Sequence, residues 1–262
     1  MIRSLYSAAT GMISQQKNID TISNNIANAN TSGFKKNRAE FTDLIYQNMK
    51  YAGTSTSATT ISPTGIQIGL GSKLSSTAKI FEIGSLKETG NHLDIAITGE
   101  GFFGITLPDG STAYTKNGSF KINGDGNITT SEGYLLDPII SIPQNVTDVN
   151  IGEDGTVTVL QGNGTNPATV GQILLTSFIN QAGLHAMGGV MFKESVASGA
   201  PIQGIAGTNG LGQTQQGFLE LSNVKLVNEM TDLIAGQRAY EANSKAITTS
   251  DEMLQTVNQL KR

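Results

Sequence analysis

The sequence has no cysteine and only two histidines among its 262 residues, so several kinds of chemistry are excluded at once. Without cysteine the chain can form no disulfide, no thiol nucleophile and no thiolate metal site. His92 and His185 remain, but neither has a second histidine or a carboxylate three or four residues further along the chain. We expect both to be loop residues, and we predict no catalytic residue, no metal site and no cofactor.

Charge is scarce as well. Charged residues make up 15% of the chain, whereas about 25% is usual in soluble domains. Seventeen Lys and Arg against 21 Asp and Glu give a net charge of −4. The chain therefore lacks the positive electrostatic potential that attracts nucleic acid or an anionic membrane. No segment approaches the ~20 apolar residues of a membrane span, and the first thirty residues lack the apolar run of a signal peptide. We expect no nucleic-acid partner, no membrane insertion, and either a cytosolic location or export without a cleaved signal.

Two short motifs match the residue spacing of known binding loops, but the residues that follow do not fit such loops. Gly99–Gly104 has the glycine spacing of a dinucleotide fingerprint, yet a strand and a turn follow it where the pyrophosphate needs the start of a helix. Residues 123–127 carry Asn, Asp and Asn at alternate positions, as a calcium loop does. Ile128 and Tyr134, however, stand at the loop positions that need Gly and Glu. We predict a glycine-kinked strand at the first motif and a polar turn at the second.

Apolar residues recur at helical spacing through the N-terminal thirty residues. Four of them, each seven apart, form one row: Leu5, Met12, Ile19 and Ile26. This spacing is typical of a helix with an apolar seam, although the row beside it becomes polar toward Asn30. Residues 28–33 are rich in Asn, Thr, Ser and Gly, so we predict that the helix ends there.

The C-terminal segment repeats this pattern over five heptads, in the row Leu226, Leu233, Tyr240, Ile247 and Leu254. No proline interrupts the segment, so we predict a helix from Ser222 to Leu260, capped by Ser222 or Asn223. A helix of this length needs a partner along all of it. The alternative is that the two terminal helices pack within one chain. We favour burial between many copies, because polar side chains interrupt the seam of a two-helix pair.

The sequence between the two helical ends changes character twice. Residues 51–72 contain no charged residue, and Tyr46–Gly69 is predicted to be either a flexible tether or a long hairpin turning near Pro63. From Gly69 to Gly217, short β-type runs alternate with turn dipeptides, which indicates hairpins. The predicted strands are Ile95–Thr98, Phe102–Leu107, Ile139–Ile142, Thr156–Leu160 and Ile173–Ile179. The predicted turns are centred on glycines 110, 118, 124, 126, 133 and 155.

We therefore predict an α+β multidomain chain in which an all-β central domain is inserted between N- and C-terminal coiled-coil helices. The expected divisions are an N-terminal coiled-coil helix at residues 1–33, an extended arm at 34–68, the β domain at 69–217 and a C-terminal coiled-coil helix at 218–262. The two apolar rows named above are the predicted subunit interface.

Three segments taken together resemble one family, the rod and hook axial proteins of the bacterial flagellum, and most closely its distal rod members. The first contains the leading helix and the turn Ala29–Lys35. The second contains Ile97–Phe103 and Tyr114–Phe120, with Lys and Asn at 116–117 where Arg and Asp are more usual. The third, Ser222–Leu254, matches at nearly every position. The resemblance covers the chain essentially from end to end.

The resemblance implies a structural subunit of the flagellar distal rod that is not an enzyme. Such subunits assemble into a helical tubular drive shaft, a homo-oligomer that transmits torque from motor to hook. The implied partners are proximal rod and hook proteins, flagellar ring proteins and the type III export apparatus. The implied location is the flagellar basal body, spanning the periplasm, after export without a cleaved signal peptide.

Other functions stay open on the sequence alone. Proximal rod and hook subunits of the same family share both end motifs, and chain length and the uncharged arm separate them from this chain. A β-domain binding module held by a coiled-coil stalk belongs to a different class. A nucleotide-dependent enzyme would use Gly99–Gly104, in the context that argues against a nucleotide site.

Overall fold

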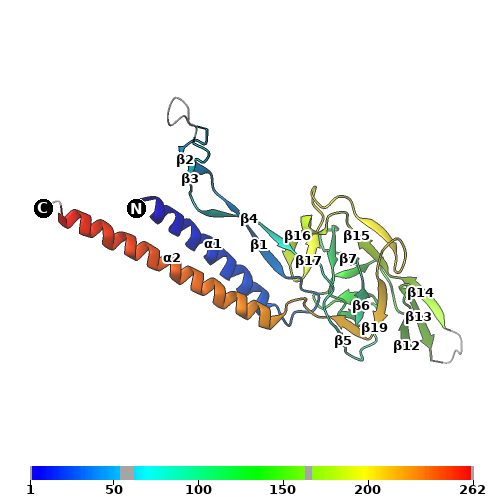
Figure 1. Ribbon diagram of the computed structural model, residues 1–262. Helices are drawn as coiled ribbons and strands as arrows, with labels where there is room; N and C mark the ends of the chain where they lie inside the picture. Colours follow the sequence, from blue (N-terminus) through cyan, green and yellow to red (C-terminus); the bar gives the residue numbers. More distant parts are fainter. Residues whose placement is uncertain (1, 54–61, 163–166, 261–262) are drawn as a thin grey trace. The chain divides into compact units, whose positions relative to one another are not determined.

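A computed structural model describes residues 2–53, 62–162 and 167–260. An N-terminal helix, α1 (Ile2–Ala27), and a C-terminal helix, α2 (Leu226–Leu260), enclose a large β-rich region in the sequence (Figure 1). At this level the predicted fold class is confirmed. Within the described residues no helix is long and apolar enough to cross a membrane.

The chain divides into two compact units. The first, called here the helical unit, comprises Met1–Ile26, Asn37–Ala78 and Lys225–Arg262. The second, the β unit, comprises Ala27–Lys36 and Lys79–Val224. Each unit is therefore built from segments that are distant in the sequence.

Both helices end near the predicted residues, but α2 begins later than predicted. The helix starts at Leu226, and the side chain of Asn223 is engaged elsewhere. Its Oδ1 accepts the backbone N–H of Lys36 at 2.8 Å and its Nδ2 donates to the carbonyl of Ile80 at 2.8 Å. The predicted cap at Ser222 or Asn223 is thus wrong, and the carbonyl of Lys225 accepts the first helical N–H, from Glu229.

Four strands belong to the helical unit. β1 (Asn37–Asp43) pairs with β4 (Ser72–Lys79), and β2 (Tyr46–Lys50) pairs antiparallel with β3 (Ile66–Gly69). The β2–β3 pairing favours the hairpin over the flexible tether at the base of the arm (Figure 1). The Ser/Thr tract at 54–60 lies outside the described residues.

The strands of the β unit are mostly short and antiparallel. Its largest sheet has nine strands, with β15 (Leu174–Ser177) joined to both β7 and β18 (Ile202–Ile205). The other seven follow the order β16 (His185–Gly188), β17 (Met191–Lys193), β8 (Thr112–Thr115), β7 (Phe102–Thr106), β11 (Leu135–Asp137), β10 (Ile128–Thr130) and β9 (Phe120–Ile122).

Three smaller sheets complete the β unit. They are β12–β13–β14 (Val146–Ile151, Thr156–Gln161, Ala168–Gln172), β6–β19 (Ile95–Thr98, Gln213–Gln216) and β5–β20 (Leu86–Glu88, Phe218–Glu220). A short 3-10 helix, Gln181–Gly183, precedes β16. His185 therefore lies in a strand and not in the predicted loop, whereas His92 lies in a turn.

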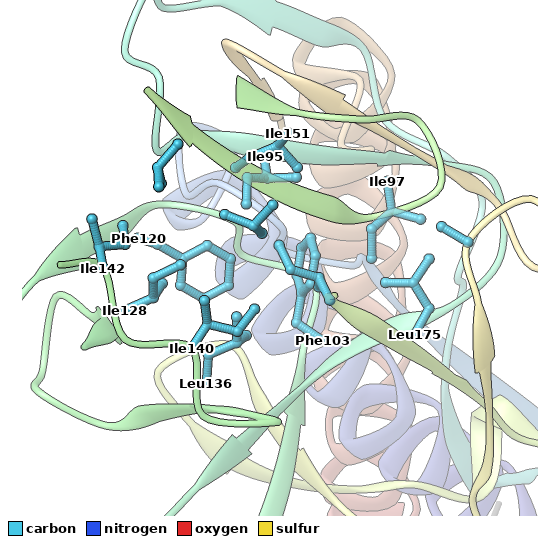
Figure 2. Packing of buried hydrophobic residues seen from close by; sticks show 14 of the residues in the cluster. Ile95, Ile97, Phe103, Phe120, Ile128, Leu136, Ile140, Ile142, Ile151 and Leu175 are labelled. Carbon is cyan, nitrogen blue, oxygen red and sulfur yellow. The ribbon is translucent and has the colours of Figure 1, made fainter. Parts of the chain in front are cut away.

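The main core lies in the β unit and is shown in Figure 2. Phe103 and Phe120 meet edge to face there, with ring centroids 5.1 Å apart. Phe102, the neighbour of Phe103 on β7, belongs to a second buried cluster with Tyr114 and Phe192. Successive side chains on a strand point to opposite faces, so β7 is buried on both sides, as its unbroken apolar sequence indicates.

Two sequence predictions in the β region are wrong. Ile139–Ile142 is not a strand. It follows Pro138, which cannot donate a ladder hydrogen bond, and enters the core through single bonds such as Ile128 N–H to the carbonyl of Ile140. Asn117-Gly118 does not connect a hairpin either. Gly118 is needed there because a Cβ would lie 1.6 Å from the carbonyl oxygen of Ile95.

The predicted kinked strand and polar turn are confirmed. Gly99 and Gly101 have φ of +140° and +128°, and the strand β7 follows them where a nucleotide fold would place a helix. A Cβ on Gly99 would lie 2.6 Å from the Cα of Gly212, so the close approach of another segment explains this glycine. In the other motif, Asn123 Oδ1 accepts the backbone N–H groups of Asp125 and Asn127, which accounts for its polar side chain.

Candidate assembly interface

Inside the helical unit, α1 and α2 pair through small and polar side chains. The α1 seam row is Ser4, Gly11, Asn18 and Asn25, and the α2 seam row is Glu229, Gly236, Asn243 and Ser250. Each row has a spacing of seven, and the rows run antiparallel. The hydroxyls of Ser4 and Ser250 are 3.4 Å apart at one end, and Asn25 Nδ2 donates to Glu229 Oε2 at 3.0 Å at the other.

Glycine allows the two helices to approach closely along these rows. A Cβ on Gly11 would lie 3.0 Å from Asn243 Nδ2, and one on Gly236 would lie 3.3 Å from Ile19 Cγ1. Both distances are tighter than most real Cβ contacts, so a Cβ at either position would require the facing side chain to shift by a few tenths of an ångström. The pairing of α1 with α2 is therefore close and largely polar.

The predicted apolar rows lie next to the seam rows on each helix, and Ile19 also reaches the seam, where it lies against Gly236. Leu5, Met12, Ile19 and Ile26 on α1 are half-buried, as are Leu233, Ile247 and Leu254 on α2. Leu226 and Tyr240 are exposed. The helix pair thus covers most of both rows and leaves Leu226 and Tyr240 as their exposed members. Apolar periodicity does not predict the seam rows, although Ser, Gly and Asn follow the same heptad spacing in the sequence.

A further apolar surface lies at the start of α2. Val227, Met230 and Ile234, called here the outer patch, are spaced as one helix face, and Val227 is 76% exposed. Further along the same face the side chains become charged, with Arg238 and Glu241 in an ion pair at 3.2 Å. Apolar side chains gathered on one exposed face mark a surface that interacts with another molecule.

The β2–β3 hairpin also exposes apolar side chains. Ile45, just before β2, is 83% exposed, and the hairpin residues Tyr46, Met49, Tyr51 and Ile66 are exposed too. An isolated two-stranded hairpin is marginally stable in water. The hairpin therefore has the composition of a surface that packs against a partner.

In the β unit, three charged residues form a buried triad: Lys35, Lys116 and Glu220. Lys35 Nζ lies 2.6 Å from Glu220 Oε1, and Lys116 Nζ lies 3.8 Å from Glu220 Oε2. The side chains of Lys35 and Glu220 are fully buried. Backbone groups add hydrogen bonds to the site: the carbonyls of Glu82 and Gly99 accept from the two lysines, and the N–H of Gly84 donates to Glu220 Oε1.

The triad perturbs one of its lysines strongly. Burial lowers the pKa of the Lys116 ammonium group from 10.5 to about 8, although the charge of Glu220 acts in the opposite direction. Two cations share one carboxylate here, so the cluster carries excess positive charge away from water. Position 116 departs from the family pattern, but the triad cannot be predicted from the sequence, because its members are far apart in the chain.

The remaining chemical candidates stay apart. His92 Nδ1 lies 3.5 Å from Asp148 Oδ1, and both side chains are exposed. No group of three or more His, Cys, Asp or Glu suited to a metal ion occurs among the residues described. The sites with organised geometry are thus the helix seam, the exposed apolar surfaces and the buried triad, which are features of an assembling structural protein.

Comparison with known proteins points in the same direction. Three family models match separate parts of the chain. "Flagella basal body rod protein" matches residues 5–35, "Flagellar hook protein FlgE/F/G D1 domain" matches 96–159, and "Flagellar basal body rod FlgEFG protein C-terminal" matches 215–260. Each residue of the buried triad lies in a different one of these three segments.

Curated relatives match over the full chain. The flagellar basal-body rod protein FlgG of Borreliella burgdorferi is 49% identical over all of both chains. The FlgG of Caulobacter vibrioides is 49% identical over 99% of this chain and 100% of its own, and that of Bacillus subtilis is 42% identical over all of both. The chain therefore belongs to the FlgG family of flagellar basal-body rod proteins, a structural and non-enzymatic family, as the sequence predicts.

Proposed function

We propose that this flagellar rod subunit assembles with copies of itself, through its terminal helices, into a helical tube of the distal rod that carries torque toward the hook. The observation that carries the proposal is the exposed outer patch of α2, in a chain whose relatives are rod proteins over their full length. Burying exposed apolar surface is the main favourable term in protein association.

In this assembly the predicted apolar rows form the subunit interface. Leu5, Met12, Ile19 and Ile26 would meet neighbouring copies on one side, and the row from Leu226 to Leu254 would meet them on the other, as coiled coils do. The small and polar seam supports this division. It joins α1 to α2 in one chain and leaves the apolar rows available to other chains.

The rest of the chain has distinct roles in the proposal. We propose that residues 1–33 and 218–262 act as the assembling segments, 34–68 as an arm that packs between neighbouring subunits, and 69–217 as the β domain outside the tube. The exposed apolar side chains of the β2–β3 hairpin support the role of the arm. A shaft interlocked in this way resists bending, because each subunit is held by several neighbours.

The family places the chain in the flagellar basal body, where it assembles with other rod and hook components. The finer steps are proposals. Export would use the type III apparatus without a cleaved signal, the assembled rod would span the periplasm, and ring proteins and the proximal rod would be further partners. The absence of an apolar run in the first thirty residues supports the export route.

The test places a charge on the outer patch. Ile234 is exposed in the single chain, so Ile234→Asp should leave the fold unchanged. In the assembly it would bury an unpaired carboxylate, at a cost of several kcal/mol per subunit. Electron microscopy of the concentrated chain should show rods or stacked rings for the parent and only dispersed particles for the variant.

Lys245→Asp is the control. This position lies on the same side of α2, one heptad beyond Arg238, where the surface is already charged. Its polymers should match those of the parent. Rods formed equally well by Ile234→Asp would show that the outer patch is not an interface and would remove the main support for the proposal.

A further inference from the structure

We infer that Glu229 fixes the register in which α1 and α2 of one chain pair. The question of register arises because both seam rows repeat every seven residues. A pair of heptad rows made of Ser, Gly and Asn offers similar contacts after a slip of one heptad, a shift of about 10 Å. Something other than the repeat must select the observed pairing.

The contact at Glu229 differs from the others in the seam. Its side chain carries the only charge in either row, and it lies on the buried side of α2, 7% exposed. Asn25 Nδ2 donates to Glu229 Oε2 at 3.0 Å. A buried carboxylate is costly unless it keeps such a donor, so this pair penalises any register that separates it.

Asn25 is also held in place by hydrogen bonds that do not involve Glu229. The backbone N–H of Asn37 donates to Asn25 Oδ1 at 2.9 Å, and Asn25 Nδ2 donates to the carbonyl of Asn37 at 2.9 Å. The second amide hydrogen is thereby aimed at Glu229. Asn25 is itself only 2% exposed, so water cannot replace a lost acceptor easily.

Neither slipped register offers an equivalent contact. A slip in one direction would place Asn25 opposite Gly236, which has no side-chain acceptor. A slip in the other direction would place Asn25 opposite Ser222, before the start of α2. One buried polar residue at a seam position is a known way to specify the register of a helix pair. Glu229 is therefore a positioning residue, and this role does not depend on assembly into a rod.

Disulfide cross-linking can test the inference, because the natural chain has no cysteine. Ser4→Cys is combined with Ser250→Cys to report the observed register, since the two hydroxyls are 3.4 Å apart. Ser4→Cys with Asn243→Cys reports one slip, and Ser4→Cys with Val257→Cys reports the other. A displacement of about 10 Å lies well outside the span of a disulfide, so each pair reports one register.

Each of the three double-cysteine chains is oxidised at full length and in dilute solution. The experiment is done with Glu229 intact and with one of three further substitutions: Glu229→Leu, Glu229→Gln or Glu241→Leu. Gln keeps an acceptor for Asn25, and Glu241→Leu removes an equal charge from an exposed position of the same helix. We expect the 4–250 cross-link to predominate, with slipped products as a minor fraction, with Glu229 intact and in the Gln and Glu241 backgrounds. In Glu229→Leu the slipped products should rise by about tenfold relative to the 4–250 product, which corresponds to about 1.4 kcal/mol.

Three results would overturn the inference. If Glu229→Leu still gives the 4–250 cross-link alone, the chain segments that follow α1 and precede α2 fix the register. Loss of the 4–250 cross-link in that background, with no gain of either slipped product, would assign Glu229 to helix stability only. Slipped products in Glu241→Leu would show that charge loss anywhere on α2 is sufficient.

Discussion

At the scale of single residues, one carboxylate joins three segments that are far apart in the sequence. Glu220 contacts Lys35, which follows α1, and Lys116, which follows β8. Removing one partner from a buried ion pair is far more costly than losing an exposed pair, because a charge is left without compensation. The triad therefore fastens the loop after α1 and the strand before α2 to the same point of the β unit.

The lowered pKa of Lys116 makes the stability of the β unit depend on pH. The folded pKa is about 8 and the ordinary value is 10.5, so between these values the unfolded chain binds more protons at this residue. Stability from this residue is thus lowest below pH 8 and rises toward pH 10.5. Lys116→Met should abolish this rise, a difference of a few kcal/mol. Urea unfolding of parent and variant at pH 8 and pH 10 measures it.

Other groups that titrate in this window are shared by parent and variant, so the difference between their pH profiles isolates Lys116. Burial also lowers the pKa of Lys79, and this residue is present in both chains. Identical profiles would mean that Lys116 is solvated in solution. The sequence indicated that position 116 departs from the family pattern, but its neighbour Glu220 is 104 residues away, and no local pattern predicts such a contact.

At the scale of elements, periodicity predicted both helices to within a few residues, because a heptad repeat is a strong local signal. It did not predict which face makes the intramolecular contact, since hydrophobicity alone points to the apolar rows. Ser, Gly and Asn form the seam because close approach and hydrogen bonds compensate for the lack of apolar area. The prediction of a strand at Ile139–Ile142 was wrong for a different reason. Single backbone hydrogen bonds to residues 126 and 128 replace a regular β-ladder there.

The β2–β3 hairpin gives a prediction at this scale. Ile45 is largely exposed, so Ile45→Ser should change the unfolding free energy of the isolated chain by less than about 0.5 kcal/mol. If the hairpin packs against neighbouring subunits, the same change removes apolar contact at every interface. The concentration needed for polymerisation, measured by light scattering, should therefore rise several-fold.

Val196→Ser is the matched control, since Val196 is a fully exposed aliphatic residue of the β unit. Its polymerisation should equal that of the parent. An Ile45→Ser chain that polymerises at the parent concentration would identify the arm as a spacer that makes no contact with neighbouring subunits.

At the scale of the whole molecule, the two units differ sharply in how much apolar surface they bury. In the described part of the helical unit, Ala8 and Ile22 are the buried apolar residues, whereas the β unit has three apolar clusters. The sequence predicted a β-rich centre between helices, because turn dipeptides and helical periods are local signals. It did not reveal that residues 37–78 join the helices in one unit, since that depends on long-range pairing.

The difference in core size predicts a difference in local stability. Helices draw most of their stability from packing, and α1 and α2 have little of it in a single chain. Hydrogen–deuterium exchange of the dilute protein should therefore show backbone amides in α1 and α2 exchanging orders of magnitude faster than those in β6, β7 and β13. Assembly should bury the apolar rows, so the same helical amides should become protected in polymers.

The amides of β7 serve as the internal control, because this strand is buried on both faces and should exchange slowly in both states. Ile234→Asp provides a second control, since a chain that cannot polymerise should keep fast helical exchange at high concentration. Equal protection of α2 and β7 in the dilute chain would show that the polar seam alone stabilises the helix pair. In that case the helices would be complete without neighbours, and the exposed outer patch would need another explanation than assembly.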